Sequence, residues 1–76
     1  MDSHDGSIEK MYELAEHLIA KNRAEEAVDL LLDIVAIDRN WEERKAQKLV
    51  TDVFKKLGSA NEVTVKGRKK LSKILF

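Results

Sequence analysis

The side chains best suited to chemistry are two histidines and several pairs of carboxylates, since the chain contains no cysteine. His17 has Glu13 one helical turn before it and Glu16 beside it. A lone histidine–glutamate pair on a helix is usually a solvated ion pair rather than a metal ligand or an acid–base pair. Asp29 and Asp33 are also one turn apart, but no second acid–base partner accompanies them. We therefore predict no catalytic residue, no metal site and no cofactor.

The second histidine, His4, lies in the polar N-terminal segment MDSHDGS. Asp2-Ser3-His4 could bind copper or nickel only if Met1 were removed, and removal before an aspartate is unfavourable. A signal peptide would instead be basic and then apolar, and no apolar stretch approaches the roughly 20 residues that cross a bilayer. We predict that residues 1–7 are a disordered linker or expression tail and that the protein is cytoplasmic, with no membrane partner.

The elements that must position any functional side chain belong to one small domain. The 76 residues are 43% hydrophobic and include no proline and three glycines, which is typical of a helical domain. Residues 1–43 contain 12 acidic and 4 basic side chains, whereas residues 44–76 contain 10 basic and 2 acidic ones. The basic half could bind nucleic acid or an anionic surface. We favour the alternative that an acidic helical hairpin packs beside a basic one.

The first two helices are predicted from apolar residues that recur at spacings of three and four. The first helix is expected over residues 7–21, and Asn22 can adopt the left-handed conformation that ends a helix. Its apolar stripe consists of Ile8, Met11, Tyr12, Ala15, Leu18 and Ile19. The second stripe consists of Ala24, Ala27, Val28, Leu31, Ile34 and Val35, with Leu30, Leu32 and Ile37 lying off it. The second helix should therefore be central and buried from more than one side.

The third helix is expected to begin within DRNW, residues 38–41, because Asn40 is a strong N-cap residue. Glu43, three positions later, could accept the backbone N–H of this cap. Trp41 would then be the first helical residue, largely buried with its ring over the end of the second helix. Gly58 is the expected stop after the apolar stripe of this helix, which consists of Ala46, Leu49, Val50, Val53, Phe54 and Leu57.

The fourth helix is expected to follow directly, since Ser59 and Glu62 repeat the same capping arrangement. Its apolar positions run through Val63 and Leu71 to Leu75. The fold class predicted is all-α, with two antiparallel helix pairs, four helices in total, packed as tetratricopeptide-like repeats over residues 8–76. The spacing of Leu14, Ala15, Leu18, Ala27, Leu31 and Ile34 resembles the tetratricopeptide pattern.

A more specific resemblance rests on LLDIVAIDRNW, on the spacing from Ala46 to Leu49, on FKKLG and on the terminal RKKLSKILF. Over about residues 11–76 these runs resemble the C-terminal tetratricopeptide domain of bacterial thioredoxin-like co-chaperones, also called co-chaperedoxins. The chain departs from that pattern where the family usually has prolines after the third helix, and Gly67 stands where the family tends to place an aromatic residue. We expect Gly67 to loosen the fourth helix and to leave a gap.

The resemblance implies a protein-interaction module that binds unfolding clients, chaperonin or other folding machinery, or its own thioredoxin domain. The redox chemistry of such a family would belong to that thioredoxin-like domain and not to this segment. On the tetratricopeptide template the partner-facing side would carry Tyr12, Glu16, Ile19, Lys48 and Asp52.

Two alternatives to this function stay open. The basic segment 66–73 could make a small nucleic-acid-binding domain, although a solvated helix face is the simpler interpretation and nucleic acid is the less favoured partner. The chain could instead be a homo-oligomerisation domain. We expect it to be a monomer or a weak homodimer.

Overall fold

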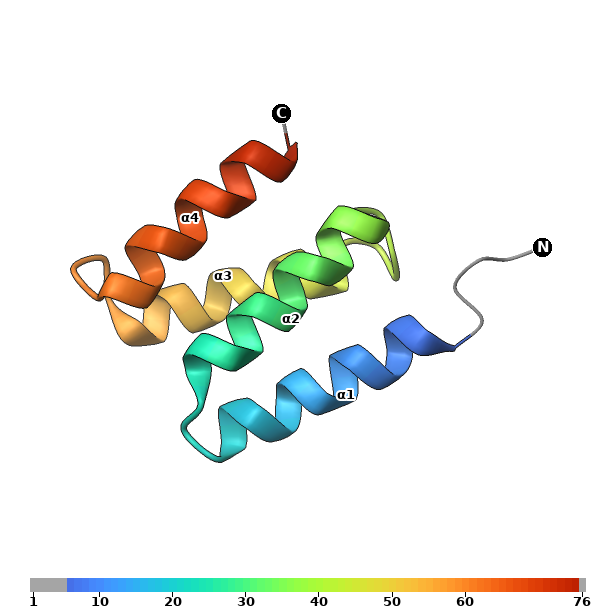
Figure 1. The fold of residues 1–76 in the computed structure, drawn as a ribbon, viewed down its shortest axis with the longest axis horizontal. Coiled ribbons are helices and arrows are strands. Elements are labelled where there is room, and N and C mark those ends of the chain that lie inside the picture. Colours follow the sequence, from blue (N-terminus) through green and yellow to red (C-terminus); the bar gives the residue numbers. More distant parts are fainter. Residues whose placement is uncertain (1–5, 76) are drawn as a thin grey trace.

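The computed structural model describes residues 6–75, and every described element of secondary structure is a helix. The helices are α1 (Ser7–Ala20), α2 (Ala24–Ile37), α3 (Lys45–Leu57) and α4 (Glu62–Leu75), joined by short connections (Figure 1). The all-α prediction is confirmed. The expected tail over residues 1–7 falls mostly outside the described residues, and Ser7 is already the first residue of α1.

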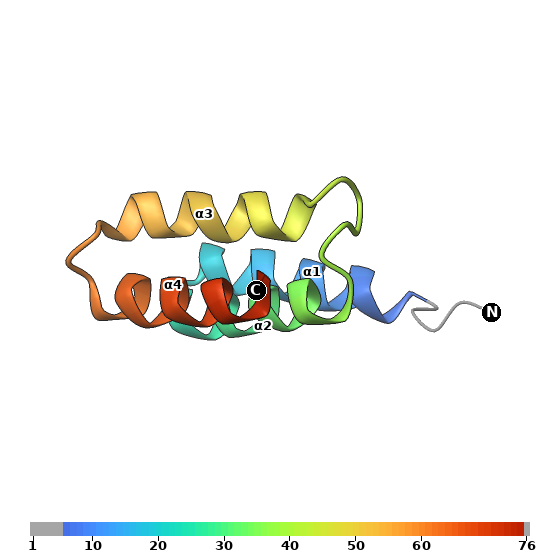
Figure 2. The same ribbon diagram turned by 90° about the horizontal axis from the view of Figure 1, so that it is seen from above.

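Helix α2 is the centre of the molecule. It lies between α1 and α4 in one layer, and α3 lies on one side of that layer (Figures 1 and 2). It packs against each of the other three helices, whereas α3 and α4 meet less extensively. The domain is flat, with principal extents of 41 × 30 × 16 Å. The central position predicted for the second helix is therefore confirmed.

The core contains the apolar residues that the helical spacing predicted. Ala15 and Ala27 are completely buried, and such small side chains let neighbouring helices approach closely. Ile37 is the exception in α2, since 53% of it is exposed. The buried apolar residues are Ile8, Tyr12, Ala15, Ala27, Val28, Leu31, Leu32, Ile34, Val35, Ala46, Val50, Val53 and Phe54.

The turn between α1 and α2 forms as the sequence predicts. Asn22 has a left-handed φ of 63°. The backbone N–H of Arg23 donates to the carbonyl of Leu18 at 2.8 Å, and that of Asn22 donates to Ile19 at 3.1 Å. This pair of hydrogen bonds defines a Schellman motif, which satisfies the last carbonyls of α1 and turns the chain back.

The prediction that Asn40 caps the third helix is wrong. The backbone N–H of Asn40 donates to Asp38 Oδ1 at 3.1 Å, so the hydrogen bond assigned to Glu43 has another acceptor. Glu43 instead lies in a run of left-handed residues with Glu42 and Arg44, at φ values of 57°, 47° and 66° respectively. Helix α3 therefore begins at Lys45, after a loop that redirects the chain.

Trp41 accordingly lies in this loop and not in the first turn of α3. Its side chain is half-buried rather than largely buried. The ring packs against Tyr12 of α1, with 5.3 Å between the ring centroids. A second tie holds the loop to α4, because Arg39 Nη1 donates to the carbonyl of Leu75 at 3.1 Å. The loop between α2 and α3 thus contacts both outer helices of the layer.

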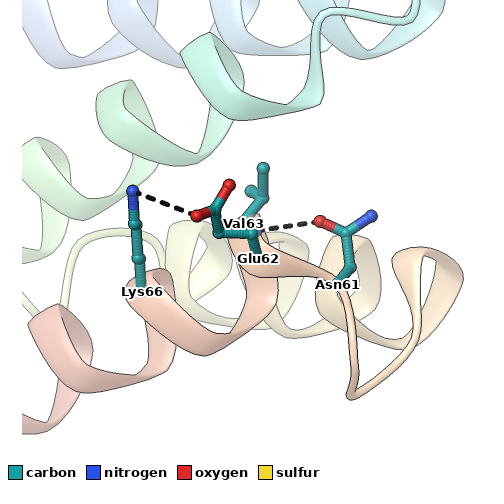
Figure 3. Close-up of polar contacts among 4 residues, drawn as sticks. All are labelled: Asn61, Glu62, Val63 and Lys66. Atoms are coloured by element: carbon teal, nitrogen blue, oxygen red, sulfur yellow. Dashed lines mark hydrogen bonds and ion pairs between the residues drawn. The ribbon is translucent and has the colours of Figure 1, made fainter.

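The connection between α3 and α4 uses the predicted glycine but a different cap. Gly58 has φ 91° and ψ 153°, a region essentially restricted to glycine, and it ends α3 as expected. Asn61 rather than Ser59 caps α4, since Asn61 Oδ1 accepts the backbone N–H of Val63 at 2.8 Å (Figure 3). Glu62 pairs with Lys66 at 3.6 Å instead of completing a capping box.

The gap expected at Gly67 does not exist. Gly67 is buried, and a Cβ added there would lie 2.6 Å from Cε1 and Cζ of Phe54 and 3.2 Å from Cγ1 of Val28. The ring of Phe54 already fills the space that a larger side chain would need. The glycine therefore lets α4 approach the core closely instead of loosening the helix.

Candidate functional site

One polar and aromatic cluster joins α1 to the start of α3. The rings of Tyr12 and Trp41 are tilted by 51° relative to each other. The ammonium of Lys45 lies 4.7 Å from the Tyr12 ring centroid and 5.9 Å from that of Trp41. Both distances fall within the range of cation–π attraction. The first residue of α3 thereby covers an aromatic pair contributed by α1 and the loop.

Carboxylates surround this aromatic pair. A shallow pocket of about 250 Å³ is lined by Tyr12, Trp41 and Lys45 together with four acidic residues, Glu9, Glu13, Glu16 and Glu42. We call these seven residues the aromatic cage. Burial raises the pKa of Tyr12 above its ordinary value of 10.0, and the nearby charges of Glu16 and Asp52 raise this pKa further. The negative potential that opposes a tyrosinate favours a cation at the same place.

A second pocket continues between α1 and α3 towards the other end of α1. It has a volume of about 340 Å³ and is lined by Ile19, Leu49, Asp52, Val53 and Lys56. Ile19 and Leu49 are half-buried apolar side chains. Asp52 connects the two pockets electrostatically, because its charge acts on Tyr12 as well. We call the cage and this apolar pocket together the α1–α3 surface.

The predicted partner-binding residues divide into two groups. Tyr12, Glu16, Ile19 and Asp52 come together on the α1–α3 surface. Lys48 lies beyond it, in a wider pocket of about 880 Å³ on the flank of α3 that Asp52 also lines. The sequence reasoning missed Lys45 and Leu49 as members of this surface. The helical spacing places Leu49 in the core stripe, and Lys45 carries no signal because its nearer ring partner, Tyr12, is distant in sequence.

The basic segment 66–73 is partly neutralised by acidic residues of the same chain. Lys66 pairs with Glu62, and Lys70 reaches Asp29 of α2 at 3.6 Å. Lys70 and Lys73 also line a pocket of about 550 Å³ between α2 and α4, together with Asp29, Leu32, Asp33, Ala36 and Ile74. These contacts agree with the expected packing of an acidic hairpin beside a basic one.

Two further features of the described part of the chain concern metal-ligand groups and membrane-spanning helices. Across residues 6–75, no group of three or more His, Cys, Asp or Glu side chains could hold a metal ion. His4 and the Asp2-Ser3-His4 motif lie outside these residues. None of the described helices is long and apolar enough to span a membrane.

Comparison with known proteins agrees with the arrangement of the helices. The family model for the tetratricopeptide repeat matches residues 1–76, and the chain therefore belongs to the tetratricopeptide repeat family. Domains of this family generally mediate protein–protein interaction and are not catalytic. No curated protein and no solved structure gives a significant match to the chain.

Proposed function

We propose that this domain is the protein-interaction module of a thioredoxin-like co-chaperone, and that it binds unfolding client proteins or the folding machinery. The observation that carries the proposal is the α1–α3 surface, where half-buried Ile19 and Leu49 lie beside an aromatic pair and a rim of charges. An apolar pocket with a polar rim is the usual composition of a protein-binding site. The runs that resemble the co-chaperedoxins support the co-chaperone context.

Within this surface the residues have different roles. Ile19 and Leu49 provide the apolar contact, since they can lose their remaining exposure to water when a partner binds. Glu16 and Asp52 set the orientation of the partner through charge, and Lys48 extends the site along the flank of α3. The domain acts in the cytoplasm as a monomer or weak homodimer, next to a thioredoxin-like domain of the same polypeptide.

The experiment compares Ile19→Ser with Val65→Ser, both truncating a surface aliphatic side chain. Val65 is a matched control because it is 43% exposed but lies on α4, away from the α1–α3 surface. Binding to a chemically unfolded model protein is measured by fluorescence anisotropy, and helix content is checked by circular dichroism. We expect Ile19→Ser to weaken binding about tenfold, the loss typical of an interface anchor, and Val65→Ser to leave it unchanged. Equal binding by both variants and the parent would contradict the proposal.

The co-chaperone context has its own test. A thioredoxin-like domain should be encoded upstream of residue 1 in the same reading frame. Reading the gene upstream checks this expectation, and a reading frame that encodes no such domain would leave the interaction module without the proposed context.

A further inference from the structure

The aromatic cage holds a cation supplied by the protein itself. The ammonium of Lys45 lies over Tyr12 and near Trp41, and Glu9, Glu13, Glu16 and Glu42 line the same pocket. Lys45 is nevertheless exposed to solvent. The cage thus combines an aromatic face with more carboxylates than ammonium groups. The position of the Lys45 ammonium shows that this site accommodates a primary ammonium group.

We propose that the aromatic cage is a recognition site for a lysine side chain on an extended segment of a partner protein, and that Lys45 is a built-in competitor for it. This inference rests on the proposed function, because it names the chemistry of the partner at the same surface. The partner's lysine takes the position of the Lys45 ammonium, and Lys45 swings into solvent.

Charge complementarity identifies this partner. The cage has four carboxylates against the single positive charge of Lys45, so a second ammonium is attracted even while Lys45 stays nearby. The ring faces attract the same charge, and desolvation strengthens that attraction when a partner covers them. An acidic partner segment would instead be repelled by the four carboxylates and attracted only by Lys45.

The exchange costs little because the competitor is an exposed side chain. Lys45 is the first residue of α3 and follows the left-handed run 42–44, so it lies at the end of the helix rather than in its middle. The lysine ammonium is carried by a flexible chain of four carbons. This chain regains rotamer freedom when the ammonium leaves the rings. Tyr12 itself stays in place, since it is only 8% exposed and belongs to the buried core.

The test uses a capped glycine–serine peptide that carries three lysines and the same peptide with all three lysines acetylated. Trp41 is the only tryptophan of the chain, so its fluorescence reports binding at the cage directly. We expect the lysine peptide but not the acetylated one to change this fluorescence. Lys45→Ala should tighten binding of the lysine peptide about two- to fivefold, the equivalent of one exposed cation–π contact.

Lys69→Ala is the matched control, since it removes the same charge from an exposed position of α4 that does not line the cage. Equal tightening by the two variants would reduce the effect to general electrostatics and overturn the proposal, as would equal binding of both peptides or no binding. Lys45→Gln serves if Lys45→Ala fails to fold by circular dichroism. If the peptide results are negative while Ile19→Ser still weakens binding of the unfolded protein, the cage proposal fails and the proposed function stands.

Discussion

At the scale of single residues, backbone conformation in the loop decides where α3 starts. Glu42, Glu43 and Arg44 are consecutive residues with positive φ. This region is unfavourable for most residues other than glycine and asparagine. The first half of the loop is nonetheless held in place, by the Asx-type hydrogen bond from Asn40 to Asp38 and by packing of Trp41 on Tyr12. The loop therefore combines a strained backbone with a packing contact to α1.

Relief of this strain should be measurable at Glu43. We expect Glu43→Gly to raise the free energy of unfolding by about 0.5–1 kcal/mol, because glycine adopts φ near 57° without a steric cost. Glu13→Gly is the control at an exposed position in the middle of α1, where the same replacement should lower that free energy by about 1 kcal/mol. Urea unfolding followed by circular dichroism gives both values. A loss of stability in Glu43→Gly would mean that the glutamate does act as a capping partner.

At the scale of helices, α4 is defined by one cap and one close approach. Asn61 satisfies the N–H of Val63 at the start of the helix, and Gly67 allows the middle of the helix to contact Phe54. The cap joins residues that are neighbours in sequence, whereas Gly67 and Phe54 are distant in sequence and meet only in the folded structure. The two can be tested separately because they lie almost two turns apart.

The cap predicts different outcomes for two neighbouring residues. Asn61→Ala should lower the free energy of unfolding by about 1 kcal/mol, since it removes the acceptor of the Val63 N–H. Ser59→Ala should change it by less than about 0.5 kcal/mol, because Ser59 is an exposed turn residue. Thermal or urea unfolding of the two variants gives the comparison. The reverse order would restore Ser59 as the cap.

The close approach predicts that added volume at Gly67 is harmful despite better helix propensity. Alanine favours a helix interior by about 1 kcal/mol over glycine, but its Cβ would overlap the buried ring of Phe54. We expect Gly67→Ala to lower the free energy of unfolding by about 1–2 kcal/mol net. In a Phe54→Leu background the same change should cost less, because the ring atoms that clash are gone. An equal cost in both backgrounds would show that the clash is not with Phe54.

At the scale of the whole molecule, the acidic first half of the chain packs against the basic second half. The basic α4 lies beside the acidic α2, and Lys70 of one reaches Asp29 of the other. Asp29 and Asp33 line the same pocket as Lys70 and Lys73, so a phosphate approaching this side meets carboxylates as well as ammonium groups. The arrangement fits a dipolar domain better than a nucleic-acid-binding face.

Weak nucleic-acid binding is the measurable consequence. Titration of the domain with a short DNA duplex and with a single strand should show binding only at low salt, because any affinity comes from counterion release. Replacing Arg68 and Lys69, which lie on the exposed side of α4, should abolish even this binding. Tight oligonucleotide binding that persists near physiological salt would contradict both this expectation and the proposed function.

The sequence by itself determined the four helices, the central position of α2, the stop at Gly58 and the turn at Asn22, since these depend on apolar periodicity and on residues with special backbone freedom. Only the tertiary structure decided the course of residues 38–44, because the local capping signal of Asn40 and Glu43 competes with Asp38 for the same N–H. It also decided that Trp41 meets Tyr12, that Lys45 covers both rings and that Gly67 makes room for Phe54. Each of these contacts joins residues from different elements. Periodicity shows which face of a helix is buried, but it does not show which side chain on another helix fills the space opposite.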